Sequence, residues 1–341
     1  MTKANLPERF ASGLLDRWLG AKVAMLIAFS LLCGAAWGQA FPSKPVLIIV
    51  TAVPGGSSDI LARRLAKIIQ AQSGANVVVD NRGGASGSIG VLATIRAPAD
   101  GYTVTLVVPD SVTVYPLLKK VRPYNAETDL TPIAQIAETH FVFAVSAKNP
   151  ANNLAEFASY IKSKPGGKAS YGSPGNGTTS RLVTEMLKQR IGIDGMQHVP
   201  YRSTAPALAG VVSGEIEMVA TSVASIKGLV DSGHLKSIGI ARESRLPGFE
   251  TIPTAAEAGI SNFIVPVWWG LFAPPRLPKD ISESLSALFV NAIASDEFKQ
   301  QAIALGLTAR PRSGADFGNF VKADTLMWQD AIQRAGIPLE D

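Results

Sequence analysis

Short apolar runs of strand length alternate with segments of helical periodicity along residues 46–240, and this alternation constrains the fold more than any other feature. Val46–Val50 is continuously apolar, as in a buried strand, and Ile60–Gln70 then places apolar residues at helical spacing. Such alternation is typical of mostly parallel sheets with helices on both faces, so the sequence predicts an α/β fold. The pattern predicts further strands at 77–79, 102–108, 141–145, 170–171, 197–199, 217–220 and 237–240, and helices at 88–96, 154–162, 179–190, 205–212 and 224–231.

The C-terminal part of the chain has a different character. After an apolar stretch at 263–272, helices are predicted at 281–294, 296–305 and 316–335. A chain of 341 residues is long enough for two domains of about 100–200 residues, each with its own hydrophobic core. The sequence contains no low-complexity linker and no short repeat of solenoid period.

The N-terminal segment has the pattern of an export signal. A positively charged stretch precedes the apolar run at 23–33, and the small residues Gly38 and Ala40 then flank Gln39. We therefore expect a secretory signal over 1–40 with cleavage after Ala40. The apolar run is shorter than the ~20 residues that a membrane-spanning helix needs, which disfavours the alternative of a retained N-terminal anchor.

Composition excludes several classes of protein. With 47% hydrophobic and 17% charged residues, the chain is too apolar to be disordered. Its single cysteine, Cys33, lies in the signal segment, which excludes a disulfide scaffold, a cysteine-rich zinc domain and an iron–sulfur protein. After residue 40, 28 basic and 25 acidic residues remain, a net charge of +3 without any basic run. We therefore expect no nucleic-acid partner.

The residue patterns of common catalytic and metal sites are missing. His140, His198 and His234 are scattered, without the spacing of metal ligands, and are interpreted as surface or strand-end residues. The sequence has no Gly-x-Ser-x-Gly elbow and no Walker motif. We expect no metal, no cofactor and no enzymatic activity.

Two turns between a predicted strand and its helix resemble each other. Val53–Asp59 and Ser173–Arg181 both place Pro-Gly and a second glycine before a pair of hydroxyl residues at a helix start. Glycines let the backbone approach a ligand, and the free N–H groups and dipole of a helix N-terminus attract anions. For one such turn alone, ordinary turn and cap chemistry is the favoured explanation. Two matching turns in different halves favour two lobes that face a ligand cleft.

Several motifs, in order along the chain, resemble a known family. They are Phe41–Val46, Pro54–Ala62, Val77–Gly90, Pro98–Tyr102, Ser173–Thr178, His198–Ala207, Ile252–Gly259 and Trp269–Pro274. Over 41–337 the chain is similar to the Bug-type extracytoplasmic solute-binding proteins of tripartite tricarboxylate transporters. The resemblance implies a two-lobed type II periplasmic binding fold with a cleft between the lobes. Lobe 1 would comprise 41–140 plus 265–341, and lobe 2 would comprise 141–264.

The resemblance also implies a function and a site. The protein would be periplasmic and would capture a small organic carboxylate, either a di- or tricarboxylate or an aromatic carboxylate. It would act as a monomer and deliver the ligand to membrane permease subunits or to a sensor protein. One carboxylate would be held by backbone amides and water between the two turns. The ligand-binding positions implied are Val53, Gly55, Gly56, Ser57, Ser58, Asp110, Ser111, Gly177, Thr178, Thr179, Ser180, Arg181, Tyr201, Arg202, Ser203, Thr204, Thr221 and Ser222.

Some residues depart from the family pattern and bear on the ligand. Thr51–Val53 replaces a frequent aromatic, Arg181 a frequent His, Arg202 a frequent Lys, and Ala220–Val223 an Asp-Asn-Leu-Pro-like stretch. Arg181 either contacts a second ligand carboxylate or faces solvent on the first turn of its helix. Asp110 would repel an anion unless it binds a hydroxyl or amine of the ligand.

Other interpretations of the sequence remain open. A dinucleotide-dependent exported enzyme is suggested by Gly175, Gly177 and an acidic residue at Asp194, although Ser180 replaces the third glycine of that fingerprint. A binding protein that only signals would have the same sequence features. The pair Trp268-Trp269 either stacks on an aromatic ligand or belongs to the core, and we expect the core.

Overall fold

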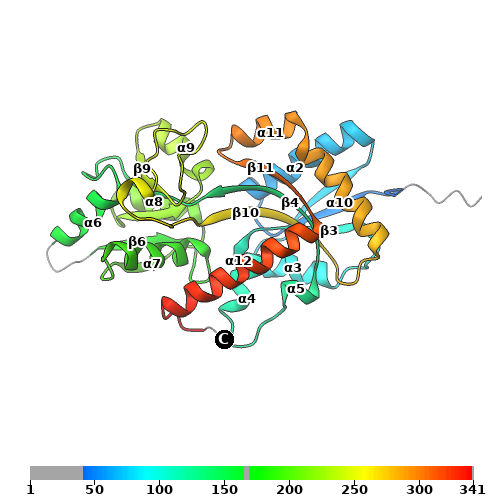
Figure 1. The fold of residues 1–341 in the computed structure, drawn as a ribbon, viewed down its shortest axis with the longest axis horizontal. Coiled ribbons are helices and arrows are strands. Elements are labelled where there is room, and N and C mark those ends of the chain that lie inside the picture. Colours follow the sequence, from blue (N-terminus) through cyan, green and yellow to red (C-terminus); the bar gives the residue numbers. More distant parts are fainter. Residues whose placement is uncertain (1–40, 165–168, 340–341) are drawn as a thin grey trace, which may run out of the picture. The chain divides into compact units, whose positions relative to one another are not determined.

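Two β-sheets, each covered by helices, organise the part of the chain that begins at Lys44 (Figure 1). The computed structural model describes residues 41–164 and 169–339, and the predicted signal segment 1–40 lies outside them. The first sheet has the strand order β11-β4-β10-β3-β1-β2 and the second the order β7-β6-β8-β5-β9. The strands are β1 Val46–Val50, β2 Val77–Asn81, β3 Thr103–Val107, β4 Thr131–His140, β5 Val142–Ser146, β6 Ser170–Ser173, β7 Gln197–Pro200, β8 Met218–Thr221, β9 Leu235–Ile240, β10 Pro266–Ala273 and β11 Thr308–Ser313.

The helices follow the strands in the predicted alternation up to residue 240. Each predicted helix is present, with ends that differ by a few residues from the expected ranges. The helices are α2 Ser57–Ser73, α3 Ser88–Ile95, α4 Tyr115–Leu117, α5 Ala126–Asp129, α6 Leu154–Ser163, α7 Thr179–Ile191, α8 Thr204–Ser213, α9 Val223–Asp231, α10 Lys279–Ala294, α11 Asp296–Ile303 and α12 Gly314–Arg334, with short helical turns η1 Ala85–Gly87, η2 Asp110–Val114 and η4 Ala256–Ala258.

The parallel part of each sheet places the candidate turns at a common edge. β1 pairs in parallel with β2 and β3, and β6 pairs in parallel with β7 and β8. The residues of β1 are almost all buried, which explains why this strand is a continuous apolar run. Parallel strands end at one edge of a sheet, so the turns after β1 and β3 lie together, and so do the turns after β6, β7 and β8.

Both sheets also contain antiparallel pairs that the strand–helix alternation does not indicate. β10 pairs antiparallel with β3 and β4, β11 with β4, and β5 with β8 and β9. The sheets are therefore mixed. Two of these strands, β4 and β11, are not among the predicted strands, because their sequences are interrupted by polar residues and proline.

The chain passes between the two sheets at two adjacent crossings. Phe141 alone separates β4 from β5, and the return crossing runs from Ala241 to Val265. Backbone hydrogen bonds join the crossings: Phe141 N–H to the Val265 carbonyl (3.4 Å), Ala241 N–H to the Phe141 carbonyl (2.8 Å) and Val265 N–H to the Ala241 carbonyl (3.1 Å). β4 and β10 run side by side toward these crossings (Figure 1). The crossings thus form a short hydrogen-bonded ribbon, the element expected of a hinge.

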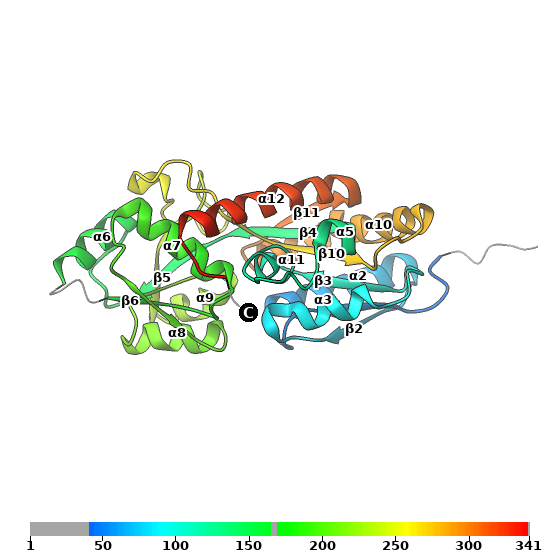
Figure 2. The ribbon, with the colours of Figure 1, turned by 90° about the horizontal axis from the view of Figure 1, so that it is seen from below.

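The long helix α12 is a further connection between the two sheets. Near its start, Phe317 packs against Trp268 and Phe272 of β10, with ring centroids 5.5 and 5.1 Å apart. Near its end, Trp328 is fully buried in a cluster that also contains Leu182 of α7. Figure 2 shows α12 lying along β4 and β11 with its C-terminal end close to α7. Trp268 and Trp269 are both buried, so the prediction that they belong to the core is confirmed.

A carboxyl group is buried where α12 meets the first sheet. Asp324 is 5% exposed and accepts a hydrogen bond from the Thr113 hydroxyl of η2 (3.2 Å). Burial raises the pKa of Asp324 from 3.8 to about 7, although the nearby Thr113 hydroxyl and the indoles of Trp268 and Trp328 lower it. Because the folded protein then binds a proton more tightly than the unfolded chain, this group favours folding least at alkaline pH.

We predict that Asp324→Asn removes a pH-dependent loss of stability. Between the unfolded pKa of 3.8 and the folded pKa of about 7, the wild-type free energy of unfolding should fall relative to the variant by about 1.4 kcal/mol per pH unit. Above pH 7 the difference should be constant. Urea unfolding of both proteins at pH 5, 6 and 8 measures this. A difference that does not vary with pH would contradict the buried, protonated carboxyl.

Candidate ligand-binding site

The turn after β1 is held by a buried carboxylate. The Asp59 side chain accepts a hydrogen bond from the Gly55 N–H (3.0 Å) and another from Arg63 Nε (3.0 Å). The Arg63 hydrogen bond is the largest cause that lowers the pKa of Asp59, and the Gly55 N–H lowers it further against the effect of burial. Gly55 has φ +85°, which other residues rarely adopt. The turn is thus fixed from within, and Val53 is left 68% exposed at its tip.

The first turn of α2 has no side-chain cap. Gly56 is the N-cap residue and offers no side-chain oxygen, so the first N–H groups of α2 are left for another acceptor. Ser57 is half-buried, whereas Ser58 is 6% exposed and accepts a hydrogen bond from Trp269 Nε1 (3.1 Å). The Ser58 hydroxyl is therefore engaged with β10, and its backbone N–H is the part left for a ligand.

A glycine-rich loop before α3 packs under this turn. A Cβ on Gly83 would lie 3.1 Å from the backbone of Ala52 and Val53, and one on Gly87 would lie 2.7 Å from Ser111 Cβ. The loop also brings Ser86 to the second turn, because a Cβ on Gly177 would lie 3.6 Å from Ser86 Oγ. Ser86 is not among the predicted site residues. Its signal in the sequence is the run of glycines at 83–90.

The turn after β6 is closed by its own hydroxyl groups. Thr178 donates to the Gly175 carbonyl (2.8 Å), and Ser180 donates to the Ala220 carbonyl of β8 (2.6 Å). Thr178 is the N-cap residue of α7, and no side chain of its own segment caps the helix. The N–H groups of Thr179 and Ser180 thus remain for an acceptor from elsewhere.

That acceptor is Asp110, which comes from the first sheet. Asp110 begins η2 directly after β3, and its Oδ1 accepts a hydrogen bond from the Thr179 N–H at 2.6 Å. Burial raises the pKa of Asp110, and the hydrogen bonds from the Thr179 N–H and hydroxyl oppose this. Neighbouring Ser111 is buried and donates back to the Val108 carbonyl (3.0 Å). The two sheets are therefore in direct contact at the predicted site.

The remaining predicted residues lie at the same edge of the second sheet. Tyr201 packs its ring between Gly172 and Gly210, and the next residues, Arg202 and Ser203, are exposed. After β8, Thr221 and Ser222 are buried. The Ser222 hydroxyl lies 2.9 Å from that of Ser225 and is thereby engaged within the second sheet.

Arg181 is turned back toward its own turn. Its Nη1 donates to the Asn176 carbonyl (3.2 Å), and its charge is among the causes that lower the pKa of His198, after burial, to about 4. Arg181 thus lies on the β6–β7 side of α7. Its Nε is buried without a hydrogen-bond partner in the structure.

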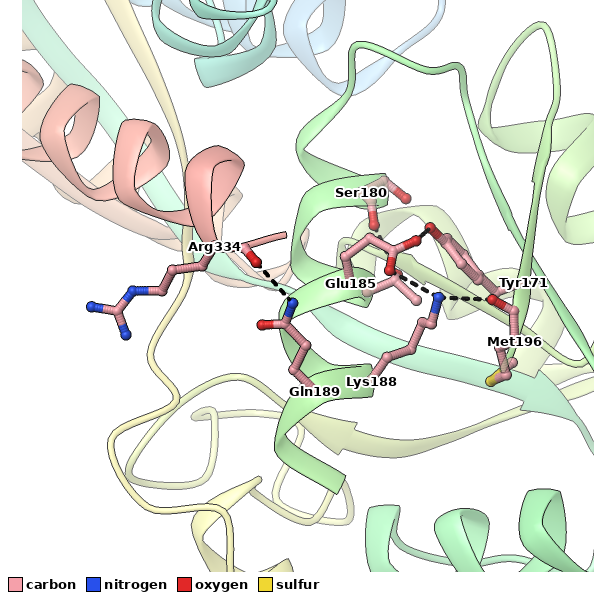
Figure 3. A network of polar contacts seen from close by, with 8 residues as sticks. Tyr171, Ser180, Glu185, Lys188, Gln189, Met196 and Arg334 are labelled. Atoms are coloured by element: carbon pink, nitrogen blue, oxygen red, sulfur yellow. Dashed lines mark hydrogen bonds and ion pairs between the residues drawn. The ribbon is translucent and has the colours of Figure 1, made fainter. Parts of the chain in front are cut away.

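A buried polar network fixes the orientation of α7 (Figure 3). The Tyr171 hydroxyl of β6 donates to Glu185, and Lys188 Nζ donates to Glu185 Oε2 (2.8 Å) and to the Met196 carbonyl (2.7 Å). Burial, followed by Glu185, raises the pKa of Tyr171. At the next residue, Gln189 Nε2 donates to the Arg334 carbonyl of α12 (3.3 Å). The helix that offers its N-terminus to the site is therefore anchored on two sides.

Two arrangements that could suggest an enzyme do not have the geometry for it. Ser173 Oγ lies 2.7 Å from His198 Nε2, but Ser173 is fully buried and its hydroxyl also contacts the Gly175 carbonyl (2.8 Å), so it is not presented to a substrate. Asp194 is exposed and precedes β7, so it lies at the opposite edge of the sheet from the glycines of a dinucleotide fingerprint.

Residues 41–164 and 169–339 contain no group of three potential metal ligands.

A hollow of about 710 Å³ lies elsewhere, between α10 and the start of α12. Pro132, Ser286 and Ala315 are among its lining residues. Its two charged lining residues, Lys279 and Glu283, are 3.7 Å apart and pair with each other. The hollow therefore offers no uncompensated charge to an anion.

Two helix-covered sheets joined by paired crossings, with glycine turns at the carboxyl ends of parallel strands, are the architecture of the periplasmic-binding-protein fold. The model of the tripartite tricarboxylate transporter family receptor, TctC, matches residues 61–337, and the chain belongs to this family. The resemblance to Bug-type proteins and the two-lobed α/β fold class are thereby confirmed. The family consists of solute-binding receptors, not of enzymes.

Several relatives match nearly the whole chain. A UPF0065 protein of Bordetella pertussis is 32% identical over 93% of this chain and 94% of its own length. Protein BugT of the same species is 28% identical over 94% of this chain and 98% of its own length. Rpa4515 of R. palustris, solved with adipate, superposes with a TM-score of 0.80 at 29% identity. The superposition covers 87% of this chain and 99% of Rpa4515. MatC from Rhodopseudomonas palustris with bound malate has a TM-score of 0.76 at 27% identity, over 86% and 100%.

None of the helices in the described residues is long and apolar enough to cross a membrane.

We predict that Lys188→Met strongly destabilises the protein, because it leaves the Glu185 carboxylate, whose side chain is only 20% exposed, without its cation. The free energy of unfolding should fall by about 3 kcal/mol. Lys299→Met is the matched control, because Lys299 also pairs with an acid three residues earlier, Asp296, but on the surface. The control should change stability by less than about 0.5 kcal/mol. Equal effects in urea unfolding would mean that the buried network does not anchor α7.

Proposed function

We propose that this protein captures a small organic carboxylate in the periplasm and delivers it to the membrane permease subunits of a tripartite tricarboxylate transporter. Membership of the receptor family supports the capture role. Relatives of similar fold that hold adipate and malate support a carboxylate as the ligand. A binding protein that serves only a sensor would bind the same ligand. Uptake of the ligand by cells with and without the gene distinguishes the two roles, because only a transport protein is needed for uptake.

The observation that carries the proposal is the uncapped first turn of α2. Its N–H groups lack a side-chain acceptor, and the exposed backbone at Val53 and Gly55 gives a ligand access to them. A carboxylate would accept these hydrogen bonds and would interact favourably with the positive end of the helix dipole. The Asp59 carboxylate in the same turn is already engaged, since its oxygens accept hydrogen bonds from the Gly55 N–H and from Arg63.

We assign the other contacts to the facing turns. Gly177 and Thr178 would cover the ligand from the second sheet, and Ser57 would donate from the first. Ser58, Ser111 and Ser180 have engaged hydroxyls, so we assign them backbone contacts or a supporting role. Tyr201, Arg202, Ser203, Thr204, Thr221 and Ser222 would form the outer wall at the second sheet.

Closure on the ligand would be a hinge movement of two lobes. We place lobe 1 at 41–140 plus 265–341 and lobe 2 at 141–264, divided at the crossings that Phe141 and Val265 join. α12 would have to slide against α7 as the lobes move, because its C-terminal end packs there. We further propose export by the 1–40 signal, with cleavage after Ala40, and a monomeric carrier.

We predict that Ser57→Asp abolishes carboxylate binding while leaving the protein folded. The added carboxylate would accept hydrogen bonds from the N–H groups of α2 and repel the ligand. The variant should stay folded, because an acidic residue at a helix start stabilises the helix by about 0.3–1 kcal/mol. Calorimetric titration of the exported protein with C4–C6 dicarboxylates, tricarboxylates, amino acids and aromatic carboxylates measures this. The best ligand of the wild type should bind the variant at least tenfold more weakly, about 1.4 kcal/mol.

The matched control is Ala315→Asp, which adds the same charge to the exposed first turn of α12. It should bind the ligand as the wild type does. Ala315 also lines the 710 Å³ hollow, so a loss of binding in this variant alone would place the ligand there and contradict the proposed site. Binding of neutral analogues only would contradict the carboxylate.

A further inference from the structure

The protein supplies a carboxylate of its own to one of the two helix N-termini of the site. Asp110 Oδ1 lies 2.6 Å from the Thr179 N–H, although η2 follows β3 of the first sheet and α7 follows β6 of the second. This N–H is one of those that the family resemblance assigns to the carboxylate of the ligand. The N-terminus of α7 is thus occupied by a carboxyl group from η2, whereas no side chain caps the N-terminus of α2, and the Asp59 carboxylate in its first turn is paired with Arg63.

No cationic side chain in the described residues acts on the pKa of Asp110, so an ionised Asp110 would find a cation only in a ligand. Burial raises the pKa of Asp110, and hydrogen bonds from the N–H and hydroxyl of Thr179 lower it. Arg181, the nearest basic residue along α7, instead donates to the Asn176 carbonyl and influences His198. The side chains that approach Gly177 from the first sheet, Ser86, Leu118 and Tyr115, are neutral.

An ionised Asp110 and a ligand carboxylate at the N-terminus of one helix would repel each other strongly, because charges interact more strongly in a partly desolvated site than in water. A second ligand carboxylate at this end is therefore disfavoured. An ammonium group, in contrast, would donate to the remaining oxygen of Asp110 in a charge-assisted hydrogen bond while Oδ1 keeps the Thr179 N–H.

We infer that Asp110 determines the ligand class: the protein takes an amino carboxylate, with its carboxylate at α2 and its ammonium group at Asp110, in preference to a dicarboxylate. This inference rests on the proposed carboxylate-binding function and narrows it. It also gives Asp110 a role that a merely structural cap would not have, because a cap would not change which ligands bind.

The test compares ligands of equal length that differ at one end. The pairs are 5-aminopentanoate and glutarate, 6-aminohexanoate and adipate, and 4-(aminomethyl)benzoate and terephthalate, titrated calorimetrically into the exported protein. The wild type should bind the amino member of the best-bound pair at least tenfold more tightly than the diacid. A diacid that binds the wild type as tightly as its amino partner, or more tightly, would overturn the inference.

Asp110→Asn should reverse this preference. The amide oxygen of the variant can still accept the Thr179 N–H, so the contact between the sheets is retained, and an unchanged melting temperature would verify this. The variant should bind the amino ligand at least tenfold more weakly and the diacid more tightly. Asp316→Asn removes the same charge from an exposed position on α12 and should leave the ratio unchanged.

The two proposals fail in different ways. A preference ratio that is the same in wild type and Asp110→Asn would overturn the inference while leaving carboxylate capture in place. If the wild type bound no carboxylate of either type, nor any from the wider panel, both the proposed function and the inference would fall.

Discussion

The first N–H groups of an α-helix have no partner within the helix, and the organisation of this site follows from how those of α2 and α7 are satisfied. Both helices begin after a glycine turn at the carboxyl end of a parallel strand. Neither is capped by a side chain of its own segment. At α7 the acceptor is Asp110 from the other sheet, which joins the two halves of the protein directly. At α2 the place of that acceptor is left for a ligand.

The rest of the structure holds these two helix starts in position. Asp59 fixes the turn before α2 through Gly55 and Arg63. Glu185 and Lys188 anchor α7 against Tyr171 and the Met196 carbonyl. A site made largely of backbone groups depends on such support, since backbone amides can be aimed only by fixing the chain around them. The crossings at Phe141 and Val265, with α12 beside them, then decide how far the two helix starts can move apart.

Much of the fold could be predicted from local patterns, and the exceptions have physical reasons. β1, β3 and most helices are marked by apolar runs or by helical spacing of buried residues. β4 escapes prediction because it contains a proline and buries Gln135 and Thr139. β11 escapes it because it is a polar edge strand, where a proline is tolerated. The antiparallel pairs depend on strands far apart in the sequence and have no local signal.

The site, like the fold, was predictable where it has a local sequence pattern and not where it depends on contacts between distant residues. The two glycine turns are visible in the sequence, and the loop that contains Ser86 links them, because it packs against the first turn and reaches Gly177 of the second. The engagement of Ser58 with Trp269, 211 residues away, and of Asp110 with Thr179, 69 residues away, has no signal in any local pattern. The sequence does indicate that an acid at position 110 is out of place beside an anionic ligand.

The most direct test of the account is the response of individual backbone N–H groups to a bound carboxylate, measured by two-dimensional ¹H–¹⁵N NMR. With saturating ligand, the amide protons at the start of α2, Ser57 and Ser58, should show the large downfield shifts that accompany a new charge-assisted hydrogen bond. The Thr179 N–H has Asp110 as its acceptor in the closed arrangement, so its chemical shift in the bound state should be nearly the same whichever carboxylate is bound. Saturation without a shift at Ser57 and Ser58 would contradict the claim that α2 receives the ligand.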